Sequence, residues 1–182
     1  MKGLMRDLIL VARGERKADL LLKNVRIINV FSGNIERGNV AIHGDKIAGI
    51  GEYEAEVEVD LKDKYVSPGF IDGHVHIESS MVRPEEFALA VVRRGTTAVI
   101  ADPHEIANVS GVAGIEYFIE ATQNLPISVF FMLPSCVPAT SLESSGACLS
   151  AQELGLFLGR PEILGLAEMM NFPGVLSLEE SV

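Results

Sequence analysis

The sequence has no long run of one charge, no basic cluster and few cysteines. Its 182 residues carry a formal net charge of -10, and the acidic residues are spread along the chain. Without a cluster of lysine and arginine to lie against phosphates, nucleic-acid binding is not expected. Cys136 and Cys148 have neither the short spacing of a zinc ribbon nor a CxxC redox motif. They are expected to be buried free thiols.

The amino-terminal segment lacks an uninterrupted apolar stretch. Arg6 and Asp7 break the apolar residues that surround them, which fits neither a signal peptide nor a membrane span. The sequence therefore predicts a cytoplasmic protein with no membrane partner. Hydrophobic residues make up 48% of the chain, enough for one sizeable core in a globular protein.

The amino-terminal third of the chain shows two different patterns. Within residues 1–18, apolar residues at helical spacing predict a short amphipathic helix over residues 3–13. Residues 19–67 contain short β-branched and apolar runs, broken at residues 32–34, 37–39 and 44–45. Those breaks are typical of turns, so this segment is expected to be a small, mostly antiparallel β-module.

From residue 68 to 182, short apolar strands alternate with helical segments, as expected of βαβ units. Strands are predicted at 70–76, 97–102, 127–133 and 164–168, and helices at 84–94, 115–122 and 151–158. The predicted fold class is α/β, an incomplete TIM-like (β/α) barrel of about four β/α units preceded by the β-module. A complete barrel usually needs about 250 residues, so this interpretation implies missing sequence. The alternative is a complete open sheet, whose last strand would then have no covering helix.

The stretch PGFIDGHVHIESS places two histidines on one face of a strand. Alternate side chains of an extended strand share a face, so His74 and His76 can converge on one metal ion. Asp72 lies on the same face, and polar groups on an otherwise apolar strand are hard to explain by packing. The alternative is a histidine pair in a loop or a pair that is hydrogen-bonded. Three further polar residues follow the strand: Glu78, Ser79 and Ser80.

Two more groups of polar residues are expected at strand ends. Asp102, His104 and Glu105 follow the strand at 97–102, and the carboxyl ends of parallel strands meet at one edge of a sheet. Helix capping by Asp102 would explain one carboxylate but not the whole cluster. Glu168 ends the strand at 164–168 and would need a partner inside a sheet, unless it is simply exposed to solvent.

Four motifs together resemble the bacterial and archaeal adenine deaminases of the amidohydrolase superfamily: PGFIDGHVHIESSM, GTTAVIADPHEIANVSG, MLPSCVPAT and GLAEMMNFPGV. An HxH after a strand marks the whole superfamily, whereas HIESSM, ADPHEIANV and a glutamate after GLA are more specific to this branch. The preceding β-module resembles the first half of that family's composite β-sandwich. The resemblance implies a barrel with two divalent metal ions, Mn²⁺ or Fe²⁺ with Zn²⁺ as an alternative. Its substrate would be the small molecule adenine, hydrolysed to hypoxanthine and ammonia in purine salvage.

The resemblance also implies roles for individual residues. His74 and His76 would bind the more buried metal ion, and Glu168 would bridge the two ions. The candidate catalytic residues are Glu78, Asp102, His104 and Glu105, and the candidate substrate contacts are Ser79 and Ser80.

Members of that family run to several hundred residues, so the resemblance implies an amino-terminal fragment. The remaining ligands and a catalytic aspartate would lie beyond Val182, and the chain alone is expected to be inactive. A homo-oligomer or a complementing downstream chain is the expected partner. Two other functions remain open: an amidohydrolase acting on cyclic amides, like a dihydroorotase or hydantoinase, and a non-catalytic metal-binding fragment.

Overall fold

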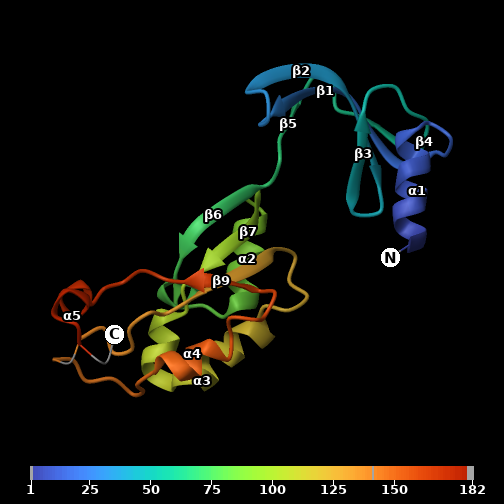
Figure 1. Ribbon diagram of the computed structural model, residues 1–182. Coiled ribbons are helices and arrows are strands. Elements are labelled where there is room, and N and C mark those ends of the chain that lie inside the picture. The colour runs from blue at the N-terminus through green and yellow to red at the C-terminus, as the bar shows by residue number, and fades with distance from the viewer. Residues whose placement is uncertain (1, 141, 180–182) are drawn as a thin grey trace. The chain divides into compact units, whose positions relative to one another are not determined.

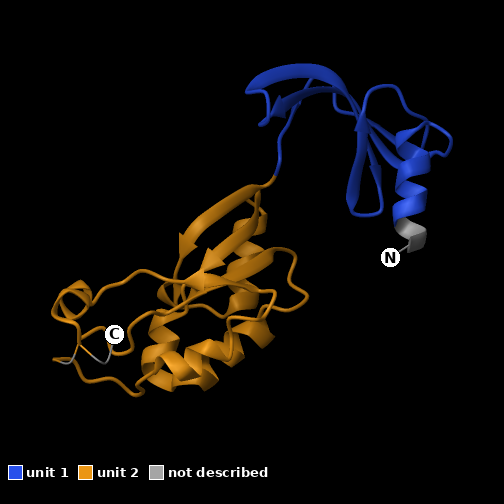
Figure 2. Ribbon diagram, viewed as in Figure 1, with its two compact units in different colours: residues 1–68 blue, residues 69–182 orange. Residues whose placement is uncertain are grey.

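Two compact units make up the chain, Met1–Pro68 and Gly69–Val182 (Figure 2). The computed structural model describes residues 2–140 and 142–179, and its helices and strands are labelled in Figure 1. Each unit contains its own cluster of buried hydrophobic residues. Among the described residues, no helix combines the length and the apolar character needed to cross a bilayer.

The first unit is a helix followed by a small mixed sheet. It contains α1 (Lys2–Ala12), β1 (Ala18–Asn29), β2 (Asn34–His43), β3 (Lys46–Ile50), β4 (Ala55–Asp60) and β5 (Tyr65–Val66). The predicted helix at 3–13 is confirmed as α1, whose Val11 is buried against Ala18, Leu21 and Ala41. Strand β2 pairs antiparallel with β1 and β3, as predicted. The other edge of β1 is long enough to pair in succession with β4 and β5, both parallel to it.

Two of the three predicted turns in this unit are present. The chain turns before β2 and again between β2 and β3, where Gly33 and Gly44 have φ values of 72° and 59°. The turn predicted at residues 37–39 is wrong, because these residues lie inside β2. Asn39 is buried there, and its Oδ1 accepts a hydrogen bond from the backbone N–H of Asn24 at 3.0 Å. That contact supports a bulge in β1 rather than a turn in β2.

The second unit is a four-stranded sheet with helices packed on it. Its elements are β6 (Phe70–Val75), η1 (Ile77–Ser80), α2 (Pro84–Val92), β7 (Thr96–Ala101), α3 (His104–Ala121), β8 (Ser128–Leu133), α4 (Ala151–Gly155), β9 (Ile163–Leu166) and α5 (Phe172–Ser177). The strands are parallel and follow the order β6-β7-β8-β9. Residues of α2, α3 and α4 pack against one face of this sheet. The α/β fold class and the four β/α units are therefore confirmed, matching half of an eight-unit barrel.

Four predictions for this unit need correction. The helix predicted at 115–122 is only the last part of α3, which begins at His104, and α4 ends at Gly155 rather than at residue 158. A short helix, α5, follows β9 where none was expected, and the Asn171 side chain caps it by accepting from the Gly174 N–H. Both cysteines lie in the loop between β8 and α4: Cys136 is buried as predicted, but Cys148 is exposed.

Candidate metal centre

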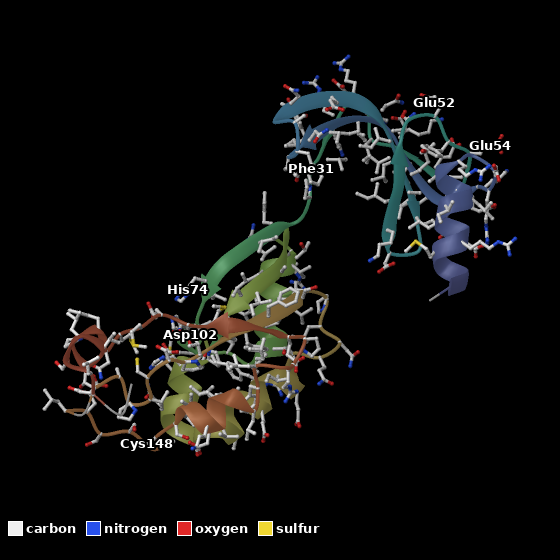
Figure 3. All side chains as sticks on the ribbon, viewed as in Figure 1. Phe31, Glu52, Glu54, His74, Asp102 and Cys148 are labelled. Atoms are coloured by element: carbon white, nitrogen blue, oxygen red, sulfur yellow. The ribbon has the colours of Figure 1, made fainter. Side chains whose placement is uncertain are left out.

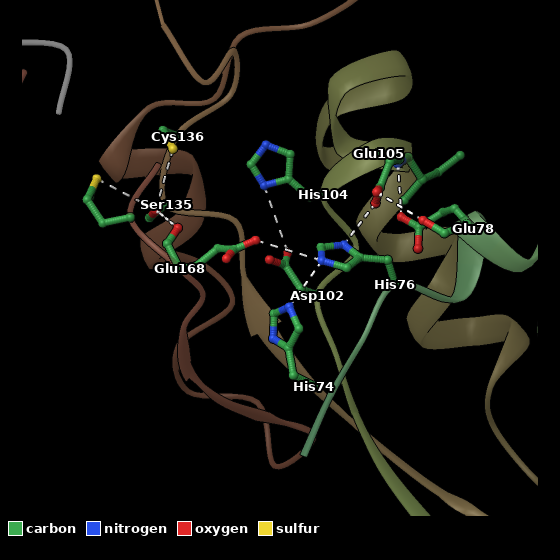
Figure 4. A network of polar contacts seen from close by, with 12 residues as sticks. His74, His76, Glu78, Asp102, His104, Glu105, Ser135, Cys136 and Glu168 are labelled. Atoms are coloured by element: carbon green, nitrogen blue, oxygen red, sulfur yellow. Dashed lines mark hydrogen bonds and ion pairs between the residues drawn. The ribbon is translucent and has the colours of Figure 1, made fainter. Parts of the chain in front are cut away.

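Four side chains from three strand ends meet at one edge of the sheet in the second unit. His74 lies on β6 and His76 directly follows it, while Asp102 follows β7 and Glu168 follows β9. Each residue offers one ligand atom, and these four atoms lie within 4.8 Å of one another. Figure 4 shows the four side chains pointing toward a common centre, and Figure 3 shows His74 and Asp102 within the whole chain.

The two histidines face each other through the same ring atom. Nε2 of His74 lies 3.1 Å from Nε2 of His76, with the ring planes at 77°. Nε2 of His76 also lies 3.8 Å from Oε1 of Glu168. Two facing imidazole nitrogens need either a proton or a cation between them, because their lone pairs repel. This arrangement fits a shared metal ion.

Asp102 is the most deeply enclosed member of the cluster. Its side chain is 0% exposed, and neither carboxylate oxygen has a hydrogen-bond partner among the described residues. Burial raises the pKa of Asp102 to about 6, against the opposing effect of the nearby His76. A buried carboxylate without a partner is costly, and a cation would supply one. Imidazole and carboxylate together are a ligand set that divalent transition metals accept, so the residues present fit such an ion.

His104 lies beside Asp102 but outside the cluster of four. Its side chain is buried, and Nδ1 is 4.0 Å from Oδ1 of Asp102, beyond hydrogen-bond reach. Neither ring nitrogen has a hydrogen-bond partner among the described residues. Burial lowers the pKa of His104, so the ring is neutral near pH 7.

The remaining candidate residues form a network between η1 and the start of α3. Oε2 of Glu105 lies 3.0 Å from Nδ1 of His76, and Oε1 of Glu105 accepts a hydrogen bond from Oγ of Ser79 at 3.2 Å. Oε1 of Glu78 accepts from the backbone N–H of Ile106 at 3.0 Å. Burial raises the pKa of Glu78, whose Oε2 is buried without a partner. In the same turn, Oγ of Ser80 donates to the carbonyl of Ile77 at 2.6 Å.

The structure thus separates the predicted site residues into two groups. The predicted ligands His74, His76 and Glu168 lie together, and Asp102, for which a catalytic role was expected, joins them. Its position could have suggested this, because Asp102 directly follows β7 as His76 follows β6. Sequence reasoning missed Ser135, whose Oγ donates to the backbone carbonyl of Glu168 at 2.6 Å. No sequence pattern reveals a contact to a backbone atom.

A cavity of about 610 Å³ lies between the loops that follow β8 and β9. Its lining is mainly apolar and includes Ser135, Cys148, Met169 and Asn171. Ser135 also contacts the backbone of Glu168, so the cavity adjoins the metal centre. Apolar cavities with a few polar groups are typical places for small ligands.

Comparison with known proteins identifies the family. Residues 65–171 match the Amidohydrolase family. An adenine deaminase from Clostridium acetobutylicum is 61% identical over 171 residues, which are 94% of this chain and 30% of that protein. Adenine deaminase 2 from Carboxydothermus hydrogenoformans is 57% identical over 178 residues, 98% of this chain and 31% of that protein. The chain therefore spans about 30% of the length of these curated relatives.

A solved structure shows the same fold at low sequence identity. The zinc complex of atrazine chlorohydrolase from Arthrobacter aurescens aligns with a TM-score of 0.59 and 17% identity. The alignment covers 81% of this chain and 46% of that one. The family match over residues 65–171 spans β6 to β9 and all four residues of the cluster formed by His74, His76, Asp102 and Glu168. The chain belongs to the amidohydrolase family.

Proposed function

We propose that this chain is part of an adenine deaminase, which hydrolyses the exocyclic amine of adenine to give hypoxanthine and ammonia. The observation that carries the proposal is the 61% identity, over 94% of the chain, to the Clostridium acetobutylicum protein of that name. The cluster of His74, His76, Asp102 and Glu168 supports it. Hydrolysis of an amine on an aromatic ring needs an activated water molecule, which a metal ion held by this cluster would provide. The adjoining cavity offers room for a purine.

The metal centre is proposed to hold two divalent ions in the complete protein, Mn²⁺ or Fe²⁺ in preference to Zn²⁺. His74, His76 and Asp102 would hold the first ion, and Glu168 would be shared between the two. Bound divalent ions lower the pKa of a coordinated water molecule toward neutrality and so provide a nucleophile. Further ligands for the second ion would come from outside residues 1–182.

The other site residues have distinct proposed tasks. His104 is neutral near pH 7 and has free ring nitrogens beside Asp102, so it is a suitable acceptor for a proton on its way to ammonia. Glu78 is held by the Ile106 N–H, which favours a positioning role over proton transfer. Ser79 and Ser80 already donate to protein oxygens, so substrate could only use their lone pairs.

Three further parts of the proposal concern the whole protein. Residues 19–67 would belong to a composite β-sandwich, and residues 68–182 to the first half of a (β/α) barrel. The protein would act in the cytoplasm. It would associate with a second copy or with a complementing chain that supplies the remaining ligands.

The proposal is tested by restoring the missing part of the protein. The isolated chain should release no ammonia from adenine with added Mn²⁺, because four side chains are too few to hold two ions with open positions. Fusing it to the part of the Clostridium acetobutylicum relative that it does not match should restore formation of hypoxanthine. His74→Ala in the fusion should abolish turnover, whereas Glu116→Gln, at an exposed site on α3, should not.

The same fusion discriminates between substrate classes. Dihydroorotate and hydantoin should not be hydrolysed. Turnover of these cyclic amides without turnover of adenine would show that the chain belongs to a different hydrolase. Metal binding with no turnover of any substrate would favour a non-catalytic role.

A further inference from the structure

A second polar network lies behind His76, on the side of its ring that faces away from the metal centre (Figure 4). Nδ1 of His76 lies 3.0 Å from Oε2 of Glu105, while Nε2 of the same ring faces His74 and Glu168. The two nitrogens of an imidazole point in diverging directions. Glu105 therefore cannot bind the same ion as Nε2 from this position, which agrees with its absence from the cluster of four.

The contact with Glu105 determines which nitrogen of His76 carries the proton. An ionised carboxylate has no hydrogen to donate and can only accept. Nδ1 must therefore be protonated, which leaves Nε2 of the neutral ring with a free lone pair. That lone pair is the one directed toward His74 and Glu168, where a ligand atom is needed.

Glu105 is itself held in place. Its second oxygen, Oε1, accepts from Oγ of Ser79 at 3.2 Å, so both carboxylate oxygens are engaged. Glu105 lies in the first turn of α3, and the next residue, Ile106, donates its backbone N–H to Glu78 of η1. The two elements are thus joined at two points. This limits how far the carboxylate can move from the ring.

We propose that Glu105 is a positioning residue, which holds His76 in the Nδ1–H tautomer and directs its Nε2 lone pair into the metal centre. The inference rests on the proposed function only in taking that centre to bind a divalent cation. Without Glu105, His76 would populate the Nε2–H tautomer, which presents a hydrogen instead of a lone pair to the ion. Carboxylates that orient a metal-binding histidine typically contribute about 10- to 100-fold to metal affinity.

Two measurements on the 182-residue chain test this. Long-range proton–nitrogen NMR correlations on the metal-free chain report which nitrogen of His76 is protonated. Calorimetric titration with Mn²⁺ and with Zn²⁺ reports metal affinity. In Glu105→Ala, both tautomers of His76 should be populated and affinity should fall about 10- to 100-fold. Glu116→Gln, also an acidic residue of α3 but exposed and far along the helix, should change neither quantity.

A conservative variant separates positioning from a general effect on the fold. Glu105→Gln keeps an oxygen that can accept from Nδ1, so it should retain more of the Nδ1–H tautomer and lose less affinity than Glu105→Ala. If Glu105→Ala does not fold, the test compares Glu105→Gln with wild type. The same two measurements, the tautomer of His76 and the metal affinity, then decide whether Glu105 positions the ring. An unchanged tautomer and unchanged affinity in the folded variants would overturn the proposal, as would an Nε2–H tautomer in the wild type.

The outcome is independent of the substrate. If the fused protein fails to deaminate adenine while the tautomer and the affinity depend on Glu105, the proposed function is wrong and the positioning role stands. If the fused protein forms hypoxanthine and Glu105→Ala behaves as wild type in both measurements, the proposed function stands and the positioning role of Glu105 is wrong.

Discussion

Asp102 is a residue whose contribution to function opposes its contribution to stability. Its side chain is 0% exposed and has no hydrogen-bond partner among the described residues. Burial raises its pKa from 3.8 to about 6. The folded protein therefore binds a proton at Asp102 more tightly than the unfolded chain does. Protonation of Asp102 therefore stabilises the folded state. This contribution to the free energy of unfolding is complete below pH 3.8 and is lost as the pH rises through about 6.

Asp102→Asn should therefore stabilise the metal-free chain at neutral pH. The raised pKa corresponds to a cost of about 3 kcal/mol once Asp102 is ionised, at roughly 1.4 kcal/mol for each pKa unit. The variant should gain up to about this amount in free energy of unfolding at pH 7.5, and almost nothing at about pH 4. Urea unfolding at both pH values, in the presence of a chelator, measures the difference.

Added Mn²⁺ should make wild type more stable than Asp102→Asn. Binding of Mn²⁺ by wild type stabilises the folded state by mass action, and the variant has lost one of the four ligands. A variant that is no more stable than wild type at pH 7.5 without metal would show that Asp102 has partners when folded. Equal stabilisation of both proteins by Mn²⁺ would show that Asp102 is not a ligand.

The bend in α3 connects the metal centre to the hydrophobic core. At Gly111 the backbone leaves helical geometry, with φ of 58° and ψ of -139°. The residues before the bend include His104 and Glu105 at the site, whereas Ile115 and Phe118 after it pack on the sheet. A Cβ added at Gly111 would lie 3.1 Å from Cβ of Ala147. Both the backbone angles and the close approach therefore favour glycine here.

Gly111→Ala should destabilise the second unit by about 1 to 3 kcal/mol, because alanine is strained at this φ and the neighbouring loop must move. Gly155→Ala is the matched control. A Cβ there meets no atom within 4 Å, and Gly155 is not among the glycines with positive φ. This control should be neutral or gain up to about 1 kcal/mol. Urea unfolding followed by circular dichroism compares the two variants, and equal losses would contradict this explanation of the bend.

The same helix shows why some elements could be predicted from the sequence and others could not. The strands β6 to β9 are short apolar runs ending in turn residues, and their predicted positions agree with the structure to within two residues. The first half of α3 begins without a side-chain cap and contains Gly111, whose backbone is not helical. It is held by tertiary contacts, including the hydrogen bond from Ile106 to Glu78 and the burial of Ala107. Such contacts are invisible in a sequence.

In the candidate site, too, local sequence patterns predict some features, whereas others depend on tertiary contacts. The period of two along a strand predicts that His74 and His76 share a face, and the structure places their Nε2 atoms 3.1 Å apart. Grouping Asp102 with them depends on β7 pairing with β6, which no local pattern fixes. The contact between Glu105 and His76 depends in addition on where α3 begins.

Curvature of the sheet determines whether a single metal centre can form. His76 and Glu168 follow β6 and β9, which are separated in the sheet by β7 and β8. In a flat sheet these strands would be about 14 Å apart, at roughly 4.8 Å for each pairing. Nε2 of His76 nevertheless lies 3.8 Å from Oε1 of Glu168. Long side chains that extend beyond the strand ends, together with a sheet that curves as the strands of a barrel do, account for this close approach.

The concave side of this sheet is left partly uncovered. On β9, Ile163 faces the helices, whereas Leu164 and Leu166 are 52% and 53% exposed. Phe70 of β6 is 64% exposed. Within the part of the chain that the structure describes, β6 pairs only with β7 and β9 only with β8, so each has a free edge. Exposed apolar side chains beside free strand edges are a common cause of association.

The chain should therefore self-associate as its concentration increases, which is the basis for the proposed second copy. In sedimentation velocity, the average mass should rise above the 19.6 kDa of one chain. Added salt should strengthen association, because it screens the repulsion between copies that each carry a net charge of -10. Leu164→Lys combined with Leu166→Lys should weaken association, whereas Leu156→Lys, at a site 80% exposed after α4, should not. A wild-type chain that keeps the mass of one copy at every concentration would leave a complementing chain as the remaining way to cover this face.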